Sequence, residues 1–198
     1  MSSLETYWIT PPLSSDPQIF QATLQATFDA HTIHKASLRG ANFPPQLLDL
    51  FAKTCHVHYI TSFLNLPTLK LSIQKALEHG FKGVHVKGAQ ILGIPHIPAN
   101  LQIFYSAHNA KEVLQALDLG AHFCTISPIC ATPNKPPPLG LDYLDQFSLE
   151  VKAHLFALGG MGYELASLLE DKGLKGFAGT RCFVPNVAIL QTHTRTRV

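Results

Sequence analysis

Apolar and polar residues along the chain follow two alternating patterns. Short apolar and β-branched runs, typical of strands, are each followed by a segment with the three- and four-residue spacing of an amphipathic helix. The runs predict strands over 6–10, 33–39, 56–63, 83–87, 101–106, 122–127, 154–158 and 176–180. The segments between and after them predict helices over 16–30, 45–54, 67–79, 89–93, 109–118, 142–150, 162–172 and 185–193.

Residues that begin and end helices agree with these boundaries. Asp16 and Pro17 are suited to the cap and the first turn of the first helix. Asn109 is suited to cap a later helix, and Gly80 and Gly120 stand where two of the helices end. The alternation of strand and helix therefore continues regularly along the chain.

This alternation predicts a parallel sheet, because parallel neighbours are joined by helical crossovers. Eight strand–helix units in 198 residues predict a closed (β/α)₈ TIM barrel, an α/β fold in which the whole chain, 1–198, is one domain. An open doubly wound sheet has the same order of elements and is the alternative. The prolines of "TPNKPPPLG" (132–140) predict a long loop after the sixth strand.

Composition narrows the class of protein. Hydrophobic residues make up 46% of the chain and charged residues 14%, which excludes a disordered chain, and the net charge of +2 is too small to indicate nucleic-acid binding. No apolar run reaches the length of about 18 residues that a membrane span needs, and the N-terminus lacks the pattern of a signal peptide. The four cysteines form no C-x-x-C pair and are expected as buried free thiols. We therefore expect a cytoplasmic protein without a nucleic-acid or membrane partner.

Candidate functional residues lie at or just after the ends of the predicted strands. In a (β/α)₈ barrel the active site lies at the C-terminal ends of the strands. The basic residues at or after these ends are Arg39, Lys87, Lys135 and Arg181, whereas most carboxylates fall on predicted helices. Cations beside backbone amides are suited to a phosphate or diphosphate, although each cation alone has the alternative of a solvated surface residue.

A glycine-rich turn, "ALGGMG", follows the seventh predicted strand. Gly159 and Gly160 allow the backbone to approach a ligand closely, and the loops after strands seven and eight commonly form a phosphate site in this fold. Thr180 and Arg181 follow the eighth strand and are expected at the same site. A tight turn without a ligand is the alternative interpretation of the glycines.

The histidines raise the alternative of a metal hydrolase. His56 and His58 share one face of the predicted third strand, and His85 and His108 lie on or after the following strands. No carboxylate ends a neighbouring strand to complete a zinc site, which disfavours this alternative. We expect His85 inside the barrel and His108 as a candidate catalytic acid or base.

A long segment resembles a known family. Residues 106–144 read "SAHNAKEVLQALDLGAHFCTISPICATPNKPPPLGLDYL", and "FALGGM" follows at 156–161. This order of motifs resembles the thiamine phosphate synthase/TenI family, which has Ser-x-His, "GADY", "GP-x-F-x-T-x-x-K", "LGL" and "AIGGI" in the same order. The runs "YWIT" (7–10), "SLRG" (37–40) and "GVHV" (83–86) resemble further motifs of that family.

The resemblance implies a function and a site. The synthase joins a pyrimidine diphosphate to a thiazole phosphate and releases diphosphate, with Mg²⁺ on the leaving group. By motif, the side chains near the phosphates would be those of Arg39, Ser106, Thr132, Asn134 and Lys135. Gly160 and the backbone near Thr180 would hold the thiazole phosphate, and Arg39 and Lys135 would neutralise charge on the leaving oxygens.

The chain departs from the family where the metal binds. The family's "ND" after the third strand has no match in "ITSFLN" (60–65), and its second metal carboxylate falls near Gln90. Mg²⁺ prefers anionic oxygen ligands, so we hypothesise that Lys87 supplies a fixed positive charge in its place. The histidine base of TenI-like members aligns with Pro128, which leaves Cys130 or His108 for that role.

These observations predict a thiamine-biosynthesis transferase that handles phosphorylated small molecules. It is expected to be a divergent synthase, with Mg²⁺ if synthase activity is retained, or a TenI-like thiazole isomerase. The alternative is a non-catalytic TenI-like protein that binds a phosphorylated ligand or has a regulatory role. A third interpretation is another phosphate-handling barrel, such as an isomerase or aldolase. The resemblance also implies a homodimer.

Overall fold

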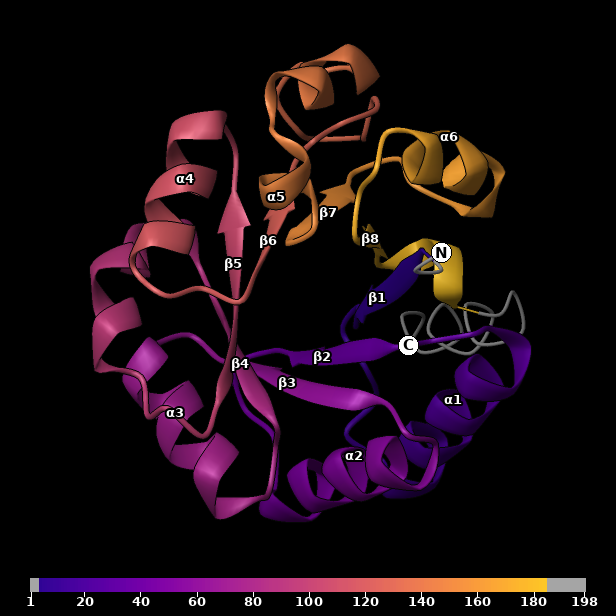
Figure 1. Ribbon diagram of the computed structural model, residues 1–198. Helices are drawn as coiled ribbons and strands as arrows, with labels where there is room; N and C mark the ends of the chain where they lie inside the picture. The colour runs from indigo at the N-terminus through magenta and orange to yellow at the C-terminus, as the bar shows by residue number, and fades with distance from the viewer. Residues whose placement is uncertain (1–3, 185–198) are drawn as a thin grey trace.

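The computed structural model describes residues 4–184. Eight parallel strands close into a barrel in chain order (Figure 1). They are β1 (Glu5–Ile9), β2 (Lys35–Arg39), β3 (Thr61–Asn65), β4 (Gly83–Val86), β5 (Gln102–Ala107), β6 (Phe123–Ile126), β7 (Leu155–Leu158) and β8 (Gly176–Gly179). The first and last strands pair, with Thr6 opposite Phe177, so the sheet is closed and the predicted (β/α)₈ barrel is confirmed over the open sheet.

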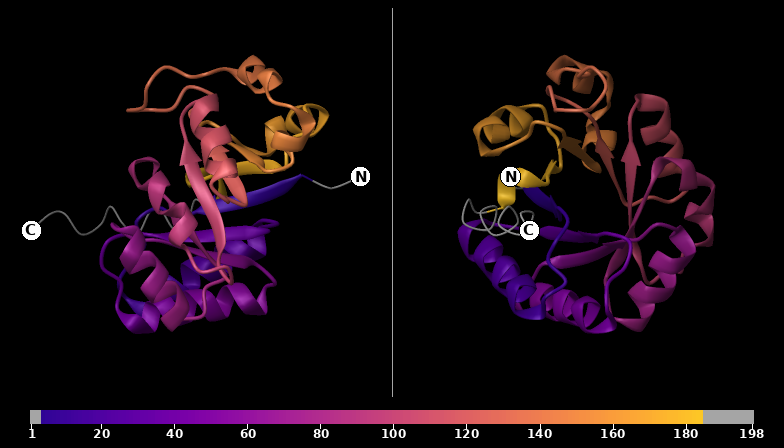
Figure 2. Two further views of the ribbon diagram at one scale, coloured as in Figure 1. Left: turned by 60° about the vertical axis from the view of Figure 1, so that its left-hand side comes forward. Right: turned by 180° about the vertical axis from the view of Figure 1, so that it is seen from behind.

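Helices surround the strands on the outside, as seen from the front in Figure 1 and from behind in Figure 2. The α-helices are α1 (Pro17–Ala30), α2 (Pro45–Val57), α3 (Leu69–Glu78), α4 (Ala110–Asp118), α5 (Leu149–Lys152) and α6 (Ala166–Asp171). The 3₁₀ helices are η1 (Gly88–His96), η2 (Leu141–Gln146), η3 (Tyr163–Leu165) and η4 (Arg181–Phe183). The helix predicted over 185–193 lies outside the described residues. Within 4–184, no helix combines the length and apolar character that crossing a bilayer requires.

The predicted starts of two helices are confirmed by their caps, whereas the helices predicted over 142–150 and 162–172 are each divided into a 3₁₀ helix and a short α-helix. The Asp16 carboxylate accepts hydrogen bonds from the backbone N–H groups of Gln18 and Ile19, at 2.9 and 3.0 Å. The Asn109 side chain accepts from the N–H of Glu112 at 2.9 Å. Gly120, which follows the helix that Asn109 begins, has a φ of +102°, a conformation that glycine adopts without strain.

The third strand differs from the prediction. A strand was expected over 56–63, but α2 continues to Val57 and β3 spans Thr61–Asn65. The buried residues of α2 keep a helical spacing as far as Cys55, and burying this stripe against the barrel outweighs the β-branched and aromatic character of "HVHYI". His56 therefore lies in the last turn of α2 and His58 caps it, so the expected strand face carrying both histidines is wrong.

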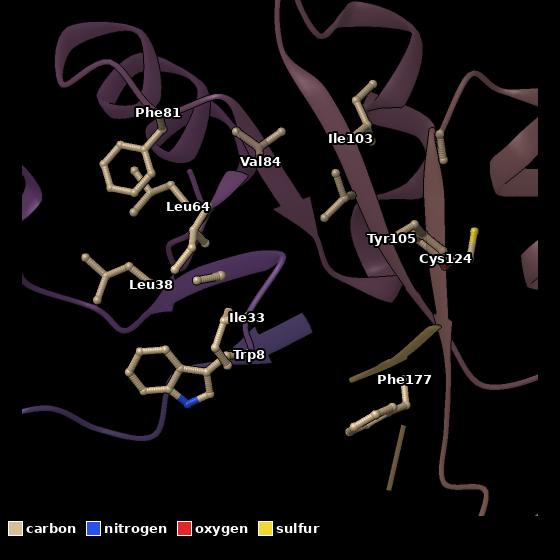
Figure 3. Close-up of a cluster of buried hydrophobic side chains, with 14 of the residues drawn as sticks. Trp8, Ile33, Leu38, Leu64, Phe81, Val84, Ile103, Tyr105, Cys124 and Phe177 are labelled. Carbon is tan, nitrogen blue, oxygen red and sulfur yellow. The ribbon is translucent and has the colours of Figure 1, made fainter. Parts of the chain in front are cut away.

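The hydrophobic core has two layers. The outer layer fills the space between strands and helices and includes Trp8, Leu38, Leu64 and Val84, which Figure 3 shows together. Its members also include Cys55 and Cys124, which are buried free thiols as expected; the thiols of Cys130 and Cys182 are only partly buried.

The inner layer fills the barrel with aromatic rings. Tyr7 and Phe104 stack at 4.0 Å between centroids, and Phe104 meets Phe63 and Phe156 edge-on at 5.1 Å. Below them Lys35 lies 4.8 Å from the Phe123 ring and pairs with Glu5, which closes the N-terminal end. Nearer the C-terminal end, Ile9, Leu158 and Ala178 are apolar, but most inward positions are polar: Ser37, Asn65, His85, Ser106 and Thr125. Polar side chains inside the barrel thus collect at its C-terminal mouth.

Candidate functional site at the mouth of the barrel

Two cations stand at the ends of neighbouring strands. Arg39 is the last residue of β2 and lies on the same face of that strand as the inward-facing Lys35, because strand side chains alternate. Lys87 directly follows β4, and its Nζ donates a hydrogen bond to the carbonyl of Leu66 at 2.9 Å. Neither cation forms an ion pair within residues 4–184. The sequence prediction that both stand at strand ends is confirmed.

The positive charges of Arg39 and Lys87 interact. Burial, and then the positive charge of Arg39, lower the pKa of the Lys87 ammonium group. Burial also lowers the pKa of Arg39 itself. The Arg39 side chain is exposed at the rim and that of Lys87 is half-buried. Two positive charges without a carboxylate partner repel each other, and an anion between them would relieve that repulsion.

Asn65 is a site residue that the sequence prediction missed. It ends β3, between the strands that carry Arg39 and Lys87, and only 4% of its surface is exposed. Its side-chain Oδ1 has no hydrogen-bond partner among the described residues. The missed signal was the apolar spacing of α2, since extending that helix by three residues moves the end of β3 to Asn65.

A hydrogen-bonded chain of three side chains runs up the barrel interior. The Tyr7 hydroxyl lies 2.7 Å from His85 Nδ1, and His85 Nε2 lies 2.7 Å from the Ser106 hydroxyl. Burial, reinforced by the charges of Arg39 and Lys87, lowers the pKa of His85 to about 3, so the imidazole is neutral. The expectation that His85 lies inside the barrel is confirmed, and Ser106 is brought to the same mouth as the two cations.

The loop after β6 packs on the glycine turn after β7. The N–H of Ile129 donates to the carbonyl of Leu158, and the N–H of Cys130 donates to that of Gly159, each at 2.9 Å. Gly159 and Gly160 have φ values of +94° and +66°. A Cβ on Gly160 would lie 2.7 Å from Cys130 Cβ, so this close approach requires glycine.

The same loop carries three of the predicted residues. Thr132 Oγ1 donates to the carbonyl of Cys130 at 3.1 Å and would be 3.3 Å from a Cβ on Gly159. Asn134 has a φ of +59°, and the N–H of Lys135 donates to the carbonyl of Thr132. The Lys135 side chain is exposed. Residues 132–140 contain no helix or strand, as predicted. Thr132 therefore meets the glycine turn, while Lys135 stands outside it.

The remaining predicted residues lie on the same rim but make separate contacts. His108 follows β5, and its Nδ1 lies 3.0 Å from the carbonyl oxygen of Ser127, to which it donates. The carbonyl of Thr180, after β8, accepts from the indole of Trp8, and Arg181 begins η4 with an exposed side chain. No hydrogen bond or ion pair among residues 4–184 joins these residues to Arg39 or Lys87.

Carboxylates are not wholly absent from the rim. Glu112, in the first turn of α4, accepts from the N–H of His108 at 2.8 Å. Glu164 lies in η3 close enough that its charge adds to burial in raising the pKa of the Cys130 thiol. Positive charge without nearby carboxylates is therefore concentrated on the β2–β4 side of the mouth.

Comparisons with known proteins agree with this architecture. The thiamine monophosphate synthase family matches residues 65–183, which is more than half of the chain. The chain belongs to this family. A thiamine-phosphate synthase from Lysinibacillus sphaericus is 29% identical over 151 residues, covering 72% of this chain and 69% of that protein. One from Chloroflexus aurantiacus is 38% identical over 76 residues, covering 37% of this chain and 35% of that protein.

A solved structure shares the fold over most of both chains. Thiamine phosphate pyrophosphorylase from Pyrococcus furiosus superposes with a TM-score of 0.72 over 95% of this chain and 92% of that one, at 18% identity. The chain spans half or less of the length of three of the curated relatives that it matches. Family membership and the barrel are thus established, and activity is a separate question.

The metal of the family does not fit the residues at these strand ends. Within residues 4–184, no three His, Cys, Asp or Glu side chains gather closely enough to hold a metal ion. β3 ends at Asn65 and is followed by Leu66. β4 is followed by Lys87 and, further on, by Gln90, whose amide donates to the carbonyl of Pro67. Mg²⁺ prefers carboxylate and water oxygens, and an ammonium group among its neighbours would repel it.

Proposed function

We propose that this protein acts in thiamine biosynthesis by binding a thiazole phosphate, a pyrimidine diphosphate, or both, at the C-terminal mouth of the barrel. In the synthase reaction it would join the two and release diphosphate. The observation that carries the proposal is the placement of Arg39 and Lys87 on either side of the buried Asn65, without a carboxylate partner among the described residues. Family membership supports the identity of the ligands.

Each part of the mouth has a proposed role. Arg39, Lys87 and Ser106 would contact the diphosphate, because two cations and a hydroxyl complement its oxygens. Thr132, Asn134 and Lys135 would contact phosphate oxygens from the loop after β6. Gly159, Gly160, Thr180 and Arg181 would hold the thiazole phosphate through backbone N–H groups and one cation.

His108 is the proposed acid or base. Its Nδ1 proton is directed to the Ser127 carbonyl, which leaves Nε2 as the acceptor in the neutral ring. An exposed imidazole at a strand end can exchange a proton with a bound ligand.

Lys87 is proposed to replace part of the charge that Mg²⁺ supplies in the family. Its ammonium group is fixed on the Leu66 carbonyl at the edge where the carboxylates of the family are missing. Binding of the diphosphate would then depend weakly on divalent cations. If synthase activity is retained, Mg²⁺ would act while bound to the substrate, since the side chains at this edge are not its preferred ligands.

The experiment that tests the proposal mixes both phosphorylated precursors with the protein, once with Mg²⁺ and once with a chelator. Formation of thiamine phosphate together with diphosphate is the expected result. Calorimetric titration with each precursor alone, again with and without chelator, measures binding separately from turnover. If neither precursor binds in either condition, the proposed function is wrong.

A second function is favoured by the missing carboxylates. A TenI-like protein that binds the phosphorylated ligand without joining the two precursors would keep Arg39, Lys87 and the glycine turn. It would bind a precursor in the titration and release no diphosphate in the assay. Interconversion of thiazole phosphate isomers, followed by NMR, would instead identify a TenI-like isomerase.

For either function we propose that residues 1–198 form one domain and that the protein works in the cytoplasm as a homodimer.

A further inference from the structure

The chain of hydrogen bonds through His85 has a direction that its burial determines. His85 is 3% exposed, and both ring nitrogens are engaged, Nδ1 with Tyr7 and Nε2 with Ser106. A neutral imidazole carries one N–H donor and one acceptor nitrogen. One neighbour must therefore donate to the ring, and the other must accept from it.

Tyr7 decides which arrangement holds. Its side chain is fully buried, and its hydroxyl lies within hydrogen-bonding distance of His85. The Ser37 hydroxyl is close enough to influence the pKa of Tyr7, but Ser37 Oγ has no hydrogen-bond partner among the described residues. If Nδ1 carried the proton, the Tyr7 O–H would therefore have no acceptor in hydrogen-bonding geometry, and buried donors are rarely left unpaired. If Tyr7 donates to Nδ1, both buried groups are satisfied. Nε2 then carries the proton and donates to the Ser106 oxygen.

This direction of the hydrogen bonds determines the role of the Ser106 hydroxyl. When its oxygen accepts from His85, the hydroxyl proton is free to point elsewhere. Ser106 is only partly buried, on β5 at the mouth, unlike Tyr7 and His85. A hydroxyl whose oxygen accepts a hydrogen bond also becomes a better donor, because successive hydrogen bonds polarise one another.

We propose that Tyr7 and His85 are positioning residues that fix the Ser106 hydroxyl as a hydrogen-bond donor to a phosphoryl oxygen of the ligand. The proposal rests on the proposed function, since it needs a phosphorylated ligand at this mouth. It adds to that function two buried residues that touch no ligand and that set the direction of the Ser106 proton. Without Tyr7, Ser106 is free to donate to His85 instead and is lost to the ligand.

The tautomer of His85 is the first test, and it needs no ligand. NMR of the whole chain with ¹⁵N-labelled histidine distinguishes a protonated from an unprotonated ring nitrogen. The His85→Gln variant identifies the His85 signals among the 11 histidines. We expect a proton on Nε2 and none on Nδ1. A proton on Nδ1 would overturn the proposal whatever the protein binds.

The second test measures binding of inorganic diphosphate by calorimetry. Ser106→Ala is expected to weaken binding about tenfold, the effect of a lost hydrogen bond to a charged group. Tyr7→Phe keeps the aromatic stack and is expected to weaken binding by a similar factor. The double variant should be no weaker than Ser106→Ala alone, because both changes remove the same contact.

A matched control removes a buried hydroxyl elsewhere. Thr27 Oγ1 on α1 is buried and has no partner among the described residues, and Thr27→Val should leave the affinity unchanged. Circular dichroism and thermal melts show whether each variant is folded. Should Tyr7→Phe not fold, the tautomer measurement on the parent protein still decides.

The two proposals fail in different ways. If the parent binds neither diphosphate nor either precursor, the proposed function is wrong, and Ser106 has no ligand to which it could donate. If the parent binds diphosphate and Tyr7→Phe binds it equally well, the function stands and the role of Tyr7 is refuted. If the losses of affinity in the two single variants added up in the double variant, the role of Tyr7 would also be refuted.

Discussion

Arg39 and Lys87 illustrate how two residues can prepare a site before any ligand arrives. Burial and mutual repulsion lower the pKa of Lys87, so the free protein holds this charge at an energetic disadvantage. An anion relieves that disadvantage on binding, in addition to making its own ion pairs. The same cations on exposed helices would gain much less, because water and salt screen them.

Arg39→Ala is therefore expected to weaken binding of inorganic diphosphate about tenfold or more, since it removes a charge-assisted contact. Titration calorimetry of the folded variant measures the effect. Lys53→Ala is the matched control, because Lys53 is an exposed cation on α2 that contributes nothing to the mouth. Equal affinity of Arg39→Ala and the parent would contradict the assignment of Arg39 to the ligand.

The loop after β6 and the turn after β7 act as one element. The loop extends the pairing of β6 and β7 past the strand ends, through the hydrogen bonds of Ile129 and Cys130. This pairing presses the loop backbone against Gly159 and Gly160, where a Cβ has no room. The loop is rich in proline and lacks regular structure, yet its position is set by this contact.

Gly160→Ala tests this element. The new Cβ would lie 2.7 Å from Cys130 Cβ at a φ of +66°, so the variant is expected to lose about 1–3 kcal/mol of stability from strain and overpacking. Its affinity for a thiazole phosphate should fall as well, because the loop must move. Urea unfolding and calorimetry measure the two effects.

Gly120→Ala separates strain from crowding. Gly120 has a φ of +102° at the end of α4, and nothing lies within 4 Å of where its Cβ would be. It should therefore lose stability through backbone strain alone and keep the parent's affinity. If both variants lose the same stability and neither loses affinity, the loop and the turn are not coupled as described.

At the scale of the whole molecule, the barrel is filled differently along its axis. The N-terminal end is closed by the ion pair of Lys35 and Glu5, and stacked aromatic rings fill the middle. The C-terminal half of the interior encloses polar groups, including an uncharged His85. Keeping this histidine neutral couples the stability of the whole barrel to pH.

Stability is expected to fall as the pH decreases from about 6.5 towards 3. Burial lowers the pKa of His85 from its ordinary 6.5 to about 3, so in this window the unfolded chain binds a proton that the folded protein does not. The free energy of unfolding should decrease by at most about 1.4 kcal/mol per pH unit through this residue. Urea unfolding at a series of pH values measures the slope.

His85→Gln is the comparison for that slope. Burial also lowers the pKa values of His34 and His122, which add slopes of the same sign in both proteins. The difference between parent and variant therefore isolates His85. If the two slopes are equal, His85 is not held neutral by the fold.

Much of the molecule was predictable from the sequence, and the parts that were not have a common cause. The caps at Asp16 and Asn109 and the loop after β6 follow from local chemistry and were predicted correctly. The boundary between α2 and β3 was not, because the segment around His56 suits a strand locally and a helix once its apolar stripe is buried.

The wrong boundary between α2 and β3 also affected the prediction of the site. With the strand ending too early, Asn65 was not recognised as the residue that ends β3. Tyr7 and His85 are 78 positions apart in sequence, and their hydrogen bond depends on which faces of β1 and β4 point inward. No local pattern specifies such a contact.

The sequence alone determined the alternation of strand and helix, the parallel sheet that it predicts and the motifs of the family, because each depends on local periodicity and on residues that begin or end elements. That the sheet closes into a barrel was decided by the pairing of β1 with β8. Only the tertiary structure decided which polar side chains share the barrel interior, and in which direction their hydrogen bonds run. The physical reason is that burial, strand register and the removal of water are properties of the assembled barrel and of no single segment.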